Sequence, residues 1–204
     1  GGYAIFAGGV GNSGGSLSVD AFDSNLSRIT LQELYQGSGD MKAAAVGDYA
    51  LFSVNGTVEI YDKSLTRYGT KALSSNRRGM AAASIGSYAL FAGGYLNSAE
   101  SNIVDAFDEN LTRITPTVLS AQSQALAAAS NANYAIFGGG ISSYSKLNNV
   151  TAYNSNLTRS TPAGLSEARM SFAAVRAGNY VVFAGDVETL AVDAYDLFLT
   201  KTLP

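Results

Sequence analysis

The polar stretches between the apolar segments of this 204-residue chain contain the tyrosines Tyr95 and Tyr144, together with amides and charged side chains. Tyrosine rings can stack on a flat partner, while amide, carboxylate and guanidinium groups can hydrogen-bond its polar atoms. Residues of these types on loops are typical of sites that recognise a sugar or a peptide. The expected ligand-binding residues are Tyr95, Asn97, Tyr144, Lys146, Arg77, Arg78, Gln124, Glu167 and Arg169. The alternative is that Arg78 and Arg169 bond backbone groups within the fold and that the loops are merely solvated.

The sequence offers little for catalysis. It contains no cysteine and no histidine, so the thiolate nucleophile, the commonest general base and the commonest metal ligand are missing. An enzyme acting on carbohydrate would need carboxylates such as Glu100, Glu167 or Asp186 to lie about 5–10 Å apart across one pocket. We therefore expect a non-enzymatic protein with no cofactor and no metal site.

Acidic or amide residues recur once per repeat, each just before a short Asn-Leu-Thr-Arg sequence or a close relative of it. Such side chains cap backbone N–H groups in tight turns, and one acid on each of several separate turns gives no six-oxygen calcium cage. The expected capping residues are Asp23, Asp62, Asp108, Asn154 and Asp196. The repeated Arg28, Arg67, Arg113 and Arg159 are expected to pair with these acids or to cover aromatic rings.

Bulk properties restrict the partners. A net charge of −3 and an isoelectric point near 4.9 give no basic surface, so we expect no nucleic-acid partner. No apolar run is long enough to cross a bilayer, which predicts no membrane insertion. The expected partner is a protein or a glycan, and of the possible locations an extracellular, cell-surface or virion one is slightly favoured.

One apolar segment occurs five times, beginning at Tyr3, Tyr49, Tyr88, Tyr134 and Tyr180, with spacings of 46, 39, 46 and 46 residues. A second segment with alternating apolar and polar residues follows each copy, as in Val-Asp-Ala-Phe-Asp from Val104, and a third runs from the turn to a late leucine. Alanine-rich segments such as 80–86 precede the later tyrosines. We interpret these as the innermost strand of each unit, where only small side chains fit.

Four short strands per repeat predict an all-β fold, a β-propeller of about five four-stranded antiparallel blades in a single domain, residues 1–204. The approximate repeat units are 1–39, 40–77, 78–123, 124–167 and 168–204. The first blade lacks its innermost strand. Either the ring closes with a three-stranded blade, or preceding residues complete it, or the chain is part of a six- or seven-bladed ring. An open blade edge could also mediate self-association.

The repeats resemble those of the kelch family over essentially the whole chain. Double glycines at 8–9, 93–94 and 138–139 and the aromatic–acid pair, as in Phe107-Asp108, carry the resemblance, together with Arg78 and Arg169 at the start of inner strands. The tryptophan of the family pattern is absent, so these look like divergent, bacterial or phage-type repeats. The resemblance implies a propeller whose loops between the first and second segments, and between units, form one binding face.

Three functions remain open from the sequence. The first is a non-enzymatic binding module that presents this loop face to a protein or a glycan. The second is a structural spacer or appendage of a larger cell-surface or phage protein. The third, an enzyme acting on carbohydrate, is disfavoured because the inner strands offer mainly alanine and serine.

Overall fold

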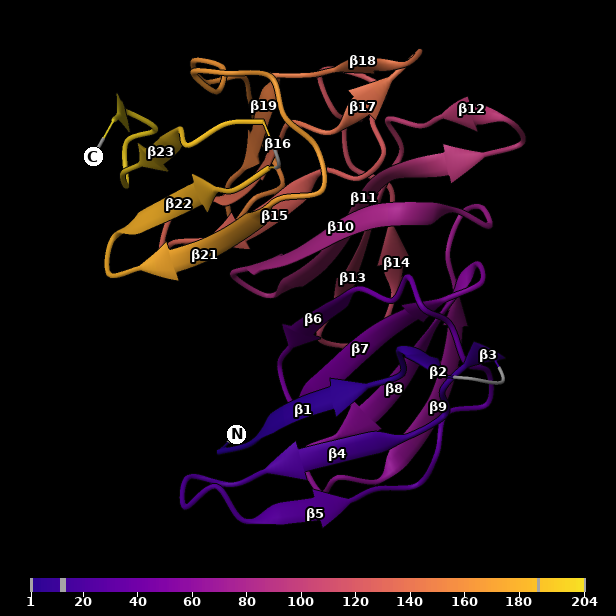
Figure 1. The fold of residues 1–204 in the computed structure, drawn as a ribbon. Coiled ribbons are helices and arrows are strands. Elements are labelled where there is room, and N and C mark those ends of the chain that lie inside the picture. The colour runs from indigo at the N-terminus through magenta and orange to yellow at the C-terminus, as the bar shows by residue number, and fades with distance from the viewer. Residues whose placement is uncertain (1, 12–13, 187, 204) are drawn as a thin grey trace.

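The structure is a computed structural model that describes residues 2–11, 14–186 and 188–203. This described part consists of β-strands, turns and loops, with no helix. Five antiparallel sheets of three to five strands follow one another in chain order and form an arc, with the two chain ends on either side of its opening (Figure 1). Two further sheets of the described part are two-stranded hairpins. The expected all-β, antiparallel, propeller-like fold is confirmed. The described residues contain no helix long and apolar enough to cross a membrane.

Each sheet lies within one of the expected repeat units. The first has the order β1 (Ala4–Ala7), β4 (Val19–Phe22), β5 (Arg28–Thr30). The second has β6 (Ala43–Val46), β7 (Tyr49–Val54), β8 (Thr57–Asp62), β9 (Arg67–Ala72). The third has β10 (Arg78–Ile85), β11 (Tyr88–Leu96), β13 (Val104–Asp108), β14 (Arg113–Ile114), with β12 (Ala99–Glu100) paired to β11. The fourth has β15 (Ala127–Ser130), β16 (Ala135–Gly138), β19 (Val150–Tyr153), β20 (Arg159–Ser160). The fifth has β21 (Ala173–Ala177), β22 (Tyr180–Ala184), β23 (Val192–Tyr195), β24 (Lys201–Thr202).

The alanine-rich segments form the edge strands β6, β10, β15 and β21, and neighbouring members of this series contact one another. Small side chains allow these strands to approach closely, which agrees with the expected crowding at the inner edge. The first sheet has three strands and no counterpart of this inner strand within the described residues, as its sequence predicts.

Aromatic pairs within a sheet pack against the sheet before it, as Phe137 and Tyr153 do against Leu90 and Val104. In the fourth sheet the rings of Phe137 and Tyr153 meet edge to face with centroids 6.1 Å apart, and both side chains are buried. The Tyr153 hydroxyl donates a hydrogen bond of 2.6 Å to the carbonyl of Thr117 in the preceding repeat. Tyr61 and Tyr195 make the same kind of contact with the carbonyls of Gln32 and Ala163. These sheets are thus tied to the ones before them by burial and by a hydrogen bond.

The turns between the second and third segments are capped as expected. One side-chain oxygen accepts two backbone N–H bonds in every repeat; for Asp108 these come from Asn110 at 2.9 Å and Thr112 at 2.7 Å. The leucine between those donors has a positive φ in all five turns. The same geometry occurs at Asp23, Asp62, Asn154 and Asp196.

The repeated arginines do not pair with the capping acids. Arg28 and Arg113 bond Asp20 and Asp105 on the adjacent strand, at 2.8 and 3.1 Å. Each arginine lies opposite the residue two positions after that aspartate, so the two side chains share one face of the sheet. Arg67 covers the ring of Tyr35 at 3.6 Å, the other expected contact. Arg159 donates to the carbonyl of Val118.

Two residue equivalences differ by one position from those suggested by the sequence. The paired glycines with positive φ in the fourth repeat are Gly139 and Gly140, which correspond to Gly93 and Gly94. The structural counterpart of Arg169 is Arg77 rather than Arg78, because Arg77 and Arg169 both bond a buried aspartate. The sequence could not indicate either shift, because each position lies in a run of identical residues, Gly138-Gly139-Gly140 and Arg77-Arg78.

Candidate binding face

The connections between the first and second segments form raised β-hairpins, where the sequence suggested only long polar loops. In the third repeat β11 continues past the double glycine, turns at Asn97 and Ser98, and returns as β12. Both turn residues have positive φ, 49° and 67°, which matches the right-handed twist of a two-residue hairpin. The fourth repeat forms a similar hairpin from β17 (Ile141–Ser142) and β18 (Ser145–Lys146), and the first from β2 (Val10–Gly11) and β3 (Gly14–Gly15).

The second repeat has no such extension. Its strands β7 and β8 are joined directly at Asn55-Gly56, the tight turn that the sequence predicts, with φ of 44° and 83°. A recess therefore lies above this turn, beside the hairpin of the third repeat. It is a polar cavity of about 360 Å³.

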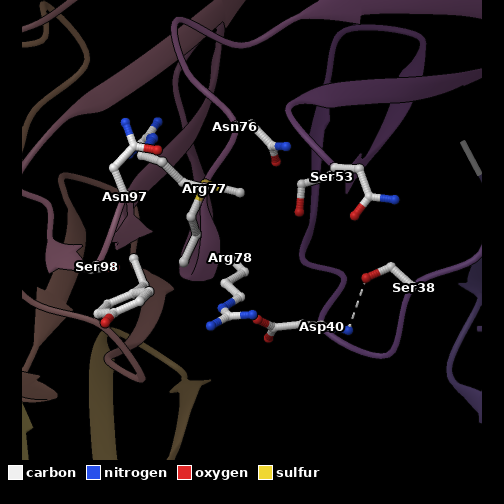
Figure 2. Close-up of a pocket in the computed structure, with 11 residues that line it drawn as sticks. Ser38, Asp40, Ser53, Asn76, Arg77, Arg78, Asn97 and Ser98 are labelled. Atoms are coloured by element: carbon white, nitrogen blue, oxygen red, sulfur yellow. Dashed lines mark hydrogen bonds between the residues drawn. The ribbon is translucent and has the colours of Figure 1, made fainter.

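Figure 2 shows residues from three repeats around this first cavity: Asn97 and Ser98 on one side, Asn76, Ser53 and Ser38 on the other, and Arg78 and Asp40 next to each other between them. Hydroxyl, amide and carboxylate groups dominate its wall. The Asp40 side chain accepts a hydrogen bond from the backbone N–H of Gly79, so it also fixes the start of the third repeat.

A second cavity of about 450 Å³ adjoins the first, because Arg78, Tyr95 and Ser98 line both. The remaining wall comes from Glu100 and from the fourth repeat, through Gln124, Ile141, Ser143 and Tyr144. Six of the expected binding residues line the two cavities. One of them, Arg77, has a side chain with 0% exposure, so five present side-chain surface to a ligand. These are Arg78, Tyr95, Asn97, Gln124 and Tyr144.

Strand pairing holds the shared wall of the cavities in place. Arg78 lies opposite Tyr95 in the β10–β11 ladder, and Tyr95 lies opposite Glu100 in the β11–β12 ladder. The Arg78 guanidinium carbon is 5.4 Å from the centroid of the Tyr95 ring. A guanidinium, a phenol and a carboxylate thus form a row across three strands, a surface that can both stack on and hydrogen-bond a ligand.

Tyr144 lies at the tip of the β17–β18 hairpin with its side chain fully exposed, at 101% of the reference area. Its φ of 64° is unusual for an aromatic residue and is imposed by the two-residue turn. A large exposed ring in a costly backbone conformation at the edge of a cavity is a feature that functional sites often carry.

Arg77 and Arg169 are not available to a ligand at the surface, since both side chains have 0% exposure. Arg77 bonds Asp105 and the carbonyls of Gly93 and Ile103. Burial lowers the pKa of the Arg77 guanidinium from its ordinary value, an effect that the Asp105 carboxylate partly offsets. Burial likewise lowers the pKa of the Arg169 guanidinium.

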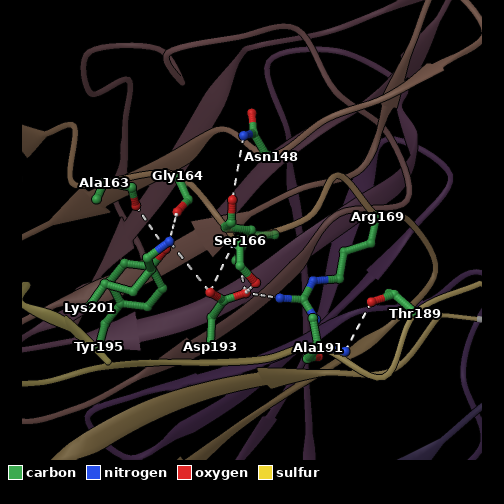
Figure 3. A network of polar contacts seen from close by, with 11 residues as sticks. Asn148, Ala163, Gly164, Ser166, Arg169, Thr189, Ala191, Asp193, Tyr195 and Lys201 are labelled. Atoms are coloured by element: carbon green, nitrogen blue, oxygen red, sulfur yellow. Dashed lines mark hydrogen bonds and ion pairs between the residues drawn. The ribbon is translucent and has the colours of Figure 1, made fainter. Parts of the chain in front are cut away.

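The network around Arg169 shows the same structural role (Figure 3). Arg169 bonds Asp193, whose carboxylate also accepts the backbone N–H and hydroxyl of Ser166. Arg77 and Arg169 therefore bond groups within the fold. For Arg169 this is the alternative given above, whereas Arg78, which was named with it, lines both cavities.

The two remaining expected residues lie outside both cavities. Lys146 bonds Asp186 at 3.0 Å and Glu188 at 2.6 Å, and these carboxylates raise the pKa of its ammonium group, Glu188 most strongly. Glu167 is exposed in the connection before the fifth sheet. Of the carboxylates considered for catalysis, Glu100 lines the second cavity, whereas Asp186 is nearly buried beside Lys146 and accepts the backbone N–H of Met170. Within the described ranges, no three acidic side chains are close enough to hold a metal ion.

The likeness to known proteins lies in the fold. No protein-family model matches the chain, and no curated protein matches it. In structure it is similar over 100% of its length to a solved structure described as that of YjhT, with a TM-score of 0.76 and 13% sequence identity, and it covers 81% of that chain. At this identity the likeness shows a shared all-β, propeller-like architecture, and folds of this kind serve many unrelated functions.

Proposed function

We propose that this chain is a divergent kelch-like propeller of about five blades that binds a glycan on the face formed by its raised hairpins. It acts as a non-enzymatic recognition module. The observation that carries the proposal is the pair of adjoining cavities that share the wall formed by Arg78 and Tyr95.

The chemistry of these walls suits a sugar. Hydroxyl groups of a sugar ring both donate and accept hydrogen bonds, and the first cavity supplies amides, hydroxyls and a carboxylate for them. The apolar face of a sugar ring packs on an aromatic ring, which Tyr95 supplies within the wall and Tyr144 at the rim. The combined volume of the cavities would accommodate a short oligosaccharide rather than a single atom or ion.

The test is a glycan screen followed by calorimetric titration of the best ligand. Tyr95→Ala and Tyr144→Ala each remove one ring and should weaken binding about tenfold or more, since an aromatic contact contributes roughly 1–3 kcal/mol. Phe198→Ala is the matched control, because Phe198 is also an exposed aromatic residue but lies at a turn between the second and third segments.

The proposal fails if Phe198→Ala weakens binding as much as the two tyrosine variants do. A screen in which no glycan binds would favour the spacer function instead. Binding of a protein without any glycan would retain the face but overturn the ligand class.

A further inference from the structure

The first sheet leaves one edge of β1 without a partner strand. β1 pairs with β4 on one side, and no strand of the described part pairs with its other side. In the other four sheets this position is filled by β6, β10, β15 or β21. The consequence is visible in burial, since β16 is buried along its whole length while its counterpart β1 alternates between exposed and half-buried residues.

A carboxylate on the strand formed by the second segment of a repeat bonds the connection that leads into the inner strand of that sheet. Asp105 and Asp193 occupy equivalent positions, and both side chains are completely buried. Each accepts the backbone N–H and hydroxyl of a serine and bonds an arginine, all from the connection that precedes its own sheet. The partners are Ser74 and Arg77 for Asp105, and Ser166 and Arg169 for Asp193. Both connections have the sequence Leu-Ser-x-x-Arg.

The arginine occurs only with the aspartate. The second and fourth repeats have Glu59 and Thr151 at the carboxylate position, and the preceding connections have Ser38 and Ser123 where the others have arginine. Thr151 bonds Ser120 in that connection, through the serine's backbone N–H and hydroxyl. Within this one chain, an aspartate at this strand position goes with an arginine in the preceding connection, and another residue there goes with a serine.

Asp20 is the third aspartate at this position. Its own sheet supplies a cation, Arg28 at 2.8 Å, as Arg113 does for Asp105. The serine and arginine of a preceding connection are the contacts it lacks among the described residues, and its side chain is 21% exposed where that of Asp105 is 0% exposed.

A groove lies beside the open edge. Tyr3 and Ile5 form one wall of a cavity of about 110 Å³, and residues of β6 and β7 in the second sheet, among them Ala45, Tyr49 and Ala50, form the other. A space of this size, adjacent to an unpaired strand edge, fits small apolar side chains such as those of the inner strands.

We propose that the open edge of the first sheet is a binding site for an extended polypeptide segment in which Leu-Ser-x-x-Arg is followed by a strand of small apolar residues. The strand adds antiparallel to β1, its alanines enter the groove, and its serine and arginine bond Asp20. The four inner strands already present in this chain show the antiparallel addition, and the connections before β10 and β21 show the serine and arginine bonds to the aspartate. The ligand is a peptide, and the site is separate from the glycan-binding face.

The test uses the full chain and a fluorescent peptide with the sequence of residues 73–86, which contains Ser74, Arg77 and the strand that follows. Fluorescence anisotropy should show saturable binding, and amides of β1 should gain protection from hydrogen exchange. Asp20→Asn should weaken binding at least about tenfold, because it removes the charge from a charge-assisted hydrogen bond. Asp23→Asn is the matched control and should leave affinity unchanged, since Asn154 caps the same turn in the fourth repeat.

A second peptide makes the test independent of any effect of the mutation on folding. Residues 119–131 contain serine in place of the arginine and pair with Thr151 in the native chain. The first peptide should bind the unchanged protein more tightly, and Asp20→Thr should reverse this preference. Equal binding of both peptides to both proteins would overturn the proposal, as would no binding of either at millimolar concentration. Association of the protein with a second copy of itself, unaffected by the peptide, would also contradict it.

Discussion

Replacing Asp105 by asparagine tests whether the buried ion pairs hold successive repeats together. The Asp105 carboxylate receives Arg77, Arg113 and the backbone N–H and hydroxyl of Ser74, and its side chain is fully buried. The substituted amide would retain an acceptor for Ser74 but would leave the Arg77 guanidinium buried without an anion. Breaking one side of a buried pair costs about 3–5 kcal/mol, and the retained acceptor places the expected loss near the lower figure.

The assay is urea unfolding at pH 7 with linear extrapolation of the free energy of unfolding. For a chain of this length, a loss of about 3 kcal/mol corresponds to a fall of roughly 6–12 °C in melting temperature. Asp20→Asn, the same change at the equivalent but uncovered position, should alter stability much less, because Asp20 and Arg28 are screened by water.

Two results would refute this reasoning. One is a loss below about 1 kcal/mol for Asp105→Asn; the other is an equal loss for Asp20→Asn. A double-mutant cycle adds a further check: Arg77→Met combined with Asp105→Asn should cost less than the two single changes added together, since the methionine leaves no charge unpaired.

Three further predictions concern stability. Burial raises the pKa of Tyr61 to about 12, so between pH 10 and 12 the folded state retains a proton that the unfolded chain loses. The protein's free energy of unfolding should therefore fall as pH rises through this window. In urea titrations at several pH values, this fall should be shallower for Tyr61→Phe than for the unchanged protein. Gly94→Ala should lower the melting temperature more than Gly9→Ala, because both residues have φ near 100° but only at Gly94 would the new Cβ lie 2.7 Å from a backbone oxygen; equal shifts would contradict this. Asp108→Ala should cost about 1 kcal/mol in urea unfolding by removing two turn hydrogen bonds, and an unchanged midpoint would show that water replaces them.

The sheets were predictable because their pattern is local and repeated. A tyrosine-led apolar segment, an alternating segment and an Asx-capped turn each have a sequence signal of a few residues, and five copies reinforce it. The inner strands were also predictable, since only alanine-rich segments suit a position where neighbouring sheets converge.

The details of the binding face were less predictable. Nothing local distinguishes Arg77 from Arg78, yet one is buried against Asp105 and the other faces two cavities. That difference depends on contacts between repeats. The hairpin tip at Tyr144 was missed because an aromatic residue has a low intrinsic preference for positive φ. Asn97-Ser98 did carry a turn signal, which could have indicated the hairpin in the third repeat.

The main contacts between sheets join neighbours in sequence order, which makes the stability of this chain a nearly one-dimensional problem. Interior repeats are braced from two sides, whereas the outermost repeats are braced from one: Phe6 is 63% exposed where Phe137 is 1% exposed, and Leu203 is 65% exposed where Leu165 is 2% exposed. Such an array frays from its ends, so proteases should cut first in the outermost repeats and leave the middle three as a resistant fragment. A ligand bound to either outermost repeat would then slow proteolysis of the whole molecule, not only of the repeat to which it binds.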